Sequence, residues 1–193
     1  MTKSRMEAFS DGVIAVIITI LVLELKVPHG ETFADLKPSL PTFMVYVLSF
    51  VYLGIYWNNH HHMLHMTSKI NGTVLWANLH LLFWLSLVPF CTAWMGHSHA
   101  APLPTAFYGF VMTMAGTAYY ILKTTIVRSQ GPASPLQAAL GSDTKGKLSV
   151  MIYAVGMLVA FVQPWIATAS YVAVALIWLV PDPRIERRMQ EHV

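Results

Sequence analysis

The chain has 193 residues, of which 55% are hydrophobic and only 11% are charged. This composition excludes an ordinary soluble domain of this length and indicates an integral membrane protein. The formal net charge of +3 comes from basic residues that lie between apolar segments rather than in one patch, which argues against nucleic-acid binding.

Six apolar segments, each a predicted transmembrane helix, follow one another along the chain. They span about 9–27, 42–66, 74–95, 105–122, 148–162 and 165–180. The last two are short for a bilayer, which takes about 20 helical residues. Gln163-Pro164 between them predicts a tight hairpin rather than a kink, because basic residues flank the pair of segments on both sides. The sequence therefore predicts an all-α membrane protein with one domain, residues 1–193.

Basic residues fall mainly on one side of this topology. If the N-terminus counts as the first loop, the odd-numbered loops hold Lys3, Arg5, Lys69, Lys123, Arg128, Lys145, Lys147, Arg184, Arg187 and Arg188. The even-numbered loops hold only Lys26 and Lys37, which acidic residues accompany. The positive-inside rule then predicts a multi-pass protein of the cell membrane with cytoplasmic N- and C-termini.

The first segment has a polar anchor on one side and an apolar stripe on the other. Asp11 stands at the start of its apolar run, where burial of a carboxylate is costly without a partner. At about 100° per residue, Val16, Ile20 and Leu23 share a narrow face roughly opposite Asp11. Thr19 flanks that stripe. By itself, such a stripe more often packs in a core or faces lipid than lines a pore.

A histidine-rich stretch, residues 60–65, ends the second segment and offers a competing signal. His61 and His65, four residues apart, share a helical face and have the spacing of metal ligands. No cysteine or carboxylate at ligand spacing accompanies them, so we expect no metal site and no cofactor. The favoured interpretation is a network of histidines and asparagines that partners Ser10 and Asp11.

Several motifs together resemble the transmembrane protein 175 family, potassium channels whose eukaryotic members work in endosomes and lysosomes. They are Arg5-x-x-x-Phe9-Ser10-Asp11, the run Leu23-Glu24-Leu25-Lys26-Val27-Pro28, the stretch from Trp57 to His65, and the stretch from Asn78 to Phe90. The chain holds one set of six segments, like the bacterial members, whereas the eukaryotic members hold two.

The resemblance implies a homotetramer whose first helices surround a central pore. It places the hydrophobic constriction at Val16, further lining positions at Ile20 and Leu23, and a residue implicated in selectivity at Thr19. The conducted ions would be potassium and other monovalent cations. The sequence contains no TVGYG filter, so selectivity would come from pore width, dewetting and Thr19.

The resemblance also implies a structural network around the first-helix motif. Its expected members are Arg5, Phe9, Ser10, Asp11, Trp57, Asn58, His61, His65, Trp76, Asn78 and His80. From the residues themselves, Arg5 is expected to neutralise Asp11, with anionic lipid headgroups as its alternative partner.

Two functions are retained from these patterns. The first is a passive potassium-permeable channel in the bilayer. The alternative is a proton- or metal-cation-coupled transporter that uses Asp11 and the patch from His60 to His65. An enzyme is not expected, because segments three to six contain no Asp, Glu, Lys or Arg for acid-base chemistry.

Overall fold

The computed structural model describes residues 2–131, 136 and 144–179. In chain order its elements are α1 (Lys3–Leu23), α2 (Phe33–Leu36), the 3-10 turn η1 (Lys37–Ser39), α3 (Leu40–His65), α4 (Gly72–Ser86), α5 (Val88–His97), α6 (Pro102–Gln130), α8 (Thr144–Val159) and α9 (Pro164–Leu179). The described residues contain no strand. The predicted all-α fold is confirmed, and each of the six apolar segments forms helix.

Within the described ranges, four stretches are both long and apolar enough to cross a bilayer: Lys3–Leu23, Phe33–His65, Gly72–His97 and Pro102–Gln130. α1 alone has 21 residues, which at about 1.5 Å per residue matches a hydrocarbon core about 30 Å thick. α8 and α9 are shorter, with 16 residues each. The chain is thus a multi-pass membrane protein.

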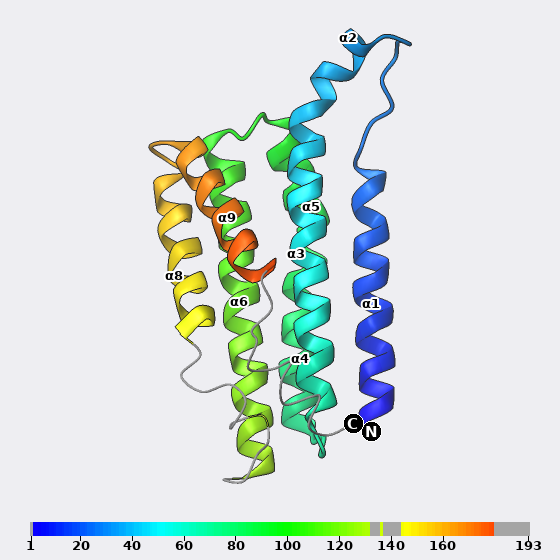
Figure 1. The fold of residues 1–193 in the computed structure, drawn as a ribbon, viewed down its shortest axis with the longest axis vertical. Coiled ribbons are helices and arrows are strands. Elements are labelled where there is room, and N and C mark those ends of the chain that lie inside the picture. The colour runs from blue at the N-terminus through cyan, green and yellow to red at the C-terminus, as the bar shows by residue number, and fades with distance from the viewer. Residues whose placement is uncertain (1, 132–135, 137–143, 180–193) are drawn as a thin grey trace.

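The long helices form an antiparallel bundle with α1 at one edge (Figure 1). α1 packs against α3, α4 and α5, while α6 packs against α4, α5, α8 and α9. α8 and α9 contact each other across the turn that ends at Gln163, so the predicted hairpin is confirmed. Among the residues that the structure describes, α1 therefore contacts the bundle with one face only, and its other face has no partner there.

The first helix occupies different residues from the predicted segment. α1 begins at Lys3, six residues before the apolar run, because a membrane helix continues through its polar end into the headgroup region. It ends at Leu23 with Glu24 as its C-cap, not at Val27. Pro28 explains part of this early end, because a proline disfavours helical geometry in the residue before it.

The third predicted segment is not one continuous helix. α4 ends at Ser86 and α5 begins at Val88, with Pro89 in its first turn. Proline has no backbone N–H and its ring clashes with the preceding turn, so it interrupts the helix. The break is one residue long, at Leu87, and the two halves form one apolar span. It is therefore a proline kink and not a pair of half-helices.

The arginines of the tail, Arg184, Arg187 and Arg188, lie outside the described residues. The described basic positions follow the predicted pattern: Lys3 begins α1, Lys69 lies between α3 and α4, and Lys147 lies near the start of α8. In the antiparallel bundle the start of α1, the end of α3 and the start of α4 lie at the same end (Figure 1).

Candidate functional site

The packed face of α1 is continuous from one end of the helix to the other. Its buried residues, three or four positions apart, are Met6, Ser10, Ile14, Ile17 and Leu21. All are apolar except Ser10. This face fixes the rotation of α1 about its own axis and therefore decides which residues point away from the bundle.

The predicted pore-lining residues lie on the face that points away. Val16 is 56% exposed, Ile20 39% and Leu23 77%. Thr19 is also exposed, and its hydroxyl donates to the carbonyl of Val16 at 2.9 Å. The threonine oxygen keeps its lone pairs, so it remains able to accept a hydrogen bond or contact a cation. The stripe is thus apolar with one available oxygen beside it.

A groove runs along this exposed face between α1 and the kinked pair α4 and α5. Its volume is about 890 Å³. α1 contributes Phe9, Val16 and Ile20 to one wall, while Ser86 and Pro89 at the helix break contribute to the other. The groove is lined mainly by apolar side chains, and a single chain leaves it open.

A buried hydrogen-bonded chain joins three helices behind the stripe. Nε2 of His60 on α3 lies 2.7 Å from Oδ1 of Asn78 on α4, and Nδ2 of Asn78 donates to Oγ of Ser10 on α1 at 2.9 Å. Ser10 in turn donates to the carbonyl of Met6 at 2.8 Å. His60, Asn78 and Ser10 are all fully or almost fully buried. Each of the three side chains therefore has a hydrogen-bond partner, as an apolar interior requires.

Asp11 lies at the rim of this chain, not within it. Its Oδ1 accepts a hydrogen bond from the indole of Trp57 at 3.0 Å. The ion pair expected between Arg5 and Asp11 is absent from the described residues, where Arg5 is exposed and Lys3 pairs with Glu7 at 3.9 Å. The first-helix carboxylate is thus held by a neutral donor from α3.

The exposed histidines form a ladder on the outer face of α3. The rings of Trp57 and His61 stack with centroids 6.2 Å apart, and those of His61 and His65 with centroids 6.4 Å apart. Lys3 donates to the backbone carbonyl of His65 at 2.8 Å, which ties the start of α1 to the end of α3. Among the described residues no group of histidine, cysteine and carboxylate side chains has the arrangement of a metal site.

The remaining residues of the expected network do not converge with Ser10 and Asp11. Phe9, Asn58 and Trp76 are exposed. His80 accepts a hydrogen bond from the indole of Trp84 one turn further along α4, at 2.9 Å. These four expected members of the network therefore do not bond to Ser10 or Asp11 within the described residues.

Sequence reasoning treated His60 only as one of several neighbouring imidazoles, whereas the structure makes it the buried member. A signal was present: His60 is in helical phase with Ser49 and Leu53, eleven and seven residues earlier, and with Leu64 four residues later, all of them buried. His61 is rotated about 100° from that face.

The chain is similar in sequence to known proteins. The family model described as "Endosomal/lysosomal potassium channel TMEM175" matches residues 5–89. A protein of Chryseobacterium sp. (strain P1-3) named "Potassium channel" is 54% identical over 192 residues and covers 100% of both chains. A human protein named "Endosomal/lysosomal proton channel TMEM175" is 34% identical over 96 residues, 43% of this chain and 19% of the human one.

A solved structure shares the fold. The crystal structure of a lysosomal potassium-selective channel TMEM175 homolog from Chamaesiphon minutus aligns with a TM-score of 0.77 at 23% identity, over 92% of this chain and 96% of that chain.

Proposed function

The chain belongs to the TMEM175 family, and we propose that it conducts potassium through a pore lined by α1. The observation that carries the proposal is the exposed apolar stripe of Val16, Ile20 and Leu23 on a helix packed by one face only. Lipid is the default neighbour of such a stripe. Membership in a channel family favours a pore instead of lipid as the surroundings of this stripe. It also makes the chain a conductor of ions and not an enzyme.

A pore of this kind needs several copies of α1 around one axis. We infer a homotetramer of six-helix chains, each a single domain of residues 1–193. The face of α1 that no described residue covers supports this assembly, because the stripe and the adjoining groove are open on it. In the tetramer Val16 would meet its symmetry mates at the axis, and neighbouring subunits would cover the rest of the open face.

The pore would select and gate without a cage of backbone carbonyls. A narrow ring of valines at position 16 excludes water. An ion therefore passes only when the ring is wide enough for the ion to keep part of its hydration shell. The hydroxyl of Thr19, one turn beyond, offers an oxygen where the partly dehydrated ion emerges. Potassium holds its water less tightly than sodium, which makes this arrangement favour potassium.

The membrane and its orientation follow from the charges. We propose the cell membrane, with both termini cytoplasmic. Lys3 and Lys69 support this, because the start of α1 and the connection between α3 and α4 lie at one end of the bundle (Figure 1), and lysines gather on the cytoplasmic side.

Replacing Thr19 with valine tests the selectivity step. We expect Thr19→Val to keep a conducting pore and to shift the reversal potential toward zero under opposed potassium and sodium gradients, because the hydroxyl is lost and the volume is kept. The measurement uses purified protein in planar bilayers. A second measurement applies a pH gradient to detect proton permeation, since the human relative is named a proton channel. An unchanged potassium preference in Thr19→Val would remove this residue from the mechanism.

The alternative, a transporter that uses Asp11 and the patch from His60 to His65, is not favoured. His60 is buried in a hydrogen bond to Asn78, and Asp11 is bound by Trp57, so neither is presented together with His61 and His65 as one coordination site. The one-residue break at Leu87 also differs from the discontinuous helices of secondary transporters.

Chelation separates these two functions. We expect metal chelators to leave thermal stability and potassium flux unchanged, because the rings of Trp57, His61 and His65 stack on one another and no metal-ligand group is found among the described residues. Elemental analysis of the purified protein is the direct measurement. The transporter would be favoured if the purified protein held stoichiometric zinc and the His61→Ala, His65→Ala double variant lost both the zinc and the flux.

A further inference from the structure

Glu24 brings a carboxylate to the groove beside the proposed pore-lining stripe. It is the C-cap of α1, and it lines the same groove as Val16 and Ile20. These three residues are spaced four apart, so each lies about 40° around the helix from the one before it. The sequence has no charged residue between Asp11 and Glu24. Glu24 is therefore the first charge that follows the apolar stripe.

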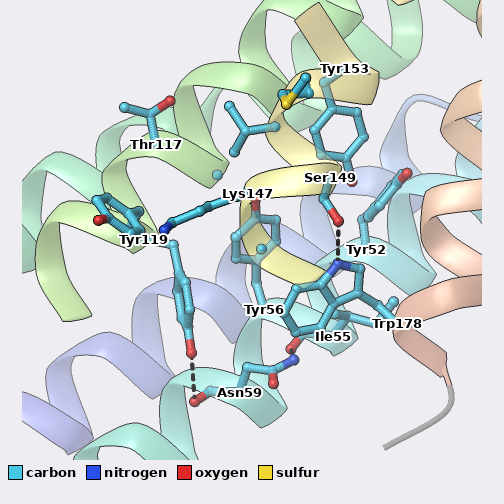
Figure 2. A pocket seen from close by; sticks show the side chains of 15 residues that line it. Tyr52, Ile55, Tyr56, Asn59, Thr117, Tyr119, Lys147, Ser149, Tyr153 and Trp178 are labelled. Atoms are coloured by element: carbon cyan, nitrogen blue, oxygen red, sulfur yellow. Dashed lines mark hydrogen bonds between the residues drawn. The ribbon is translucent and has the colours of Figure 1, made fainter. Parts of the chain in front are cut away.

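A second cavity shows that a carboxylate in such a position is not a general feature of the bundle. This cavity, of about 420 Å³, lies away from α1, between α3, α6, α8 and α9. Figure 2 shows its lining, in which aromatic side chains such as Tyr52, Tyr119 and Trp178 are prominent. The described residues that line it include no aspartate or glutamate. Of these two cavities, only the groove beside α1 presents a carboxylate that attracts cations.

The charge of Glu24 is not offset by an ion pair among the described residues. The ion pair on α1 joins Lys3 and Glu7 at the opposite end of the helix, and Glu24 is partly exposed to solvent. The segment that it begins, residues 24–37, holds three acidic and two basic side chains and thus a net charge of −1. Lys26 and Lys37 therefore do not cancel the negative charge at this end of α1.

The proposed tetramer would place four copies of Glu24 around one end of the pore. With both termini cytoplasmic, this end is the outer mouth. Eight residues separate Glu24 from Val16, which is about 12 Å along a helix. Charges act over about this range at physiological ionic strength, so the carboxylates influence an ion without touching it. Rings of acidic side chains have this effect in cation channels.

We propose that Glu24 concentrates cations at the outer mouth and thereby raises the potassium current at low ionic strength. This inference rests on the proposed function, because it needs a pore surrounded by four copies of α1. Like charges at a narrow opening raise the local concentration of counterions and lower that of ions of the same sign. Glu24 thus favours cations over anions, whereas Val16 and Thr19 act on the cation once it is inside.

The salt dependence of the conductance tests this role. Glu24→Gln keeps the size of the side chain and removes its charge, and the measurement is single-channel conductance of the purified full-length protein in planar bilayers. At about 10 mM KCl, where the Debye length is about 30 Å, we expect the variant to conduct roughly two- to fourfold less than the unaltered chain. At about 1 M KCl, where this length is about 3 Å, the two conductances should agree.

Three further variants separate charge from shape and position. Glu24→Asp keeps the charge and should keep the salt dependence of the unaltered chain. Glu31→Gln removes the same charge from an exposed loop residue outside the groove, so its loss at low salt should be smaller. In Glu24→Cys, a negatively charged thiol reagent should restore conductance and a positively charged one should lower it, since Cys91 is buried. The thermal unfolding temperature shows whether each variant is folded.

The proposal is overturned if folded Glu24→Gln conducts like the unaltered chain at low salt, or if its loss persists undiminished at high salt. It is also overturned if Glu31→Gln loses as much conductance as Glu24→Gln, or if the two thiol reagents act alike on Glu24→Cys. These results would leave the proposed function standing. That function fails instead if the unaltered chain carries no potassium current at any salt concentration.

Discussion

Val16→Asn is expected to raise potassium flux and weaken discrimination among cations, while Val16→Phe is expected to suppress flux. A polar side chain in an apolar ring lets water enter the constriction, and a larger apolar one obstructs it. A barrier lowered by about 1.4 kcal/mol raises a rate about tenfold, and we expect changes of about this size in each direction. Flux into liposomes that contain the purified protein, with the oligomeric state checked for each variant, is the measurement.

Ile18 supplies the matched control. It is two residues from Val16 but is partly buried and packs against the core. Ile18→Asn should therefore lower thermal stability and leave ion discrimination in the surviving folded protein unchanged, because it places an amide in an apolar contact. Equal effects of the asparagine substitutions at 16 and 18 on the flux of folded protein would show that the pore face is wrongly assigned.

Asn78→Leu is expected to lower the free energy of unfolding by about 1–3 kcal/mol, because it leaves the buried ring nitrogen of His60 without a partner. In a membrane we expect a loss near or just below the bottom of this range, because hydrogen bonds between helices average about 0.6 kcal/mol there. The same substitution at exposed Asn58 should change stability by no more than about 0.5 kcal/mol. Thermal or denaturant unfolding of purified protein provides the comparison.

A double variant separates the hydrogen bond from general loss of packing. If His60 and Asn78 stabilise each other, His60→Leu combined with Asn78→Leu should lose less stability than the sum of the two single variants. Strict additivity would mean that the two side chains do not act as a pair.

The helices were predictable from the sequence because a membrane imposes long apolar runs on the chain. The stripe of Val16, Ile20 and Leu23 was predictable for a related reason, since helical periodicity alone places these residues on one face. The structure adds that this face is exposed in a single chain. Whether it meets an aqueous axis is a property of the assembly, which periodicity cannot supply.

Other features depend on tertiary contacts. His60, His61 and His62 are consecutive, and the choice of His60 as the buried residue depends on where Asn78 of α4 lies against α3. Asp11 was expected to meet Arg5, but Trp57 is the donor that α3 brings within reach. The break before Pro89 was visible as a proline, yet the apolar pattern continues across it and predicted a single segment.

The central claim, that the exposed stripe of α1 lines the ion path, is most directly tested by cysteine accessibility. Cys91, the chain's single cysteine, is buried, so the unaltered chain should be insensitive to a charged thiol reagent added to an open channel. We predict that Val16→Cys and Ile20→Cys lose most of their potassium current on modification, while Ile18→Cys keeps its current. The claim would be contradicted if the reagent abolished the current of Ile18→Cys and left the current of Val16→Cys unchanged.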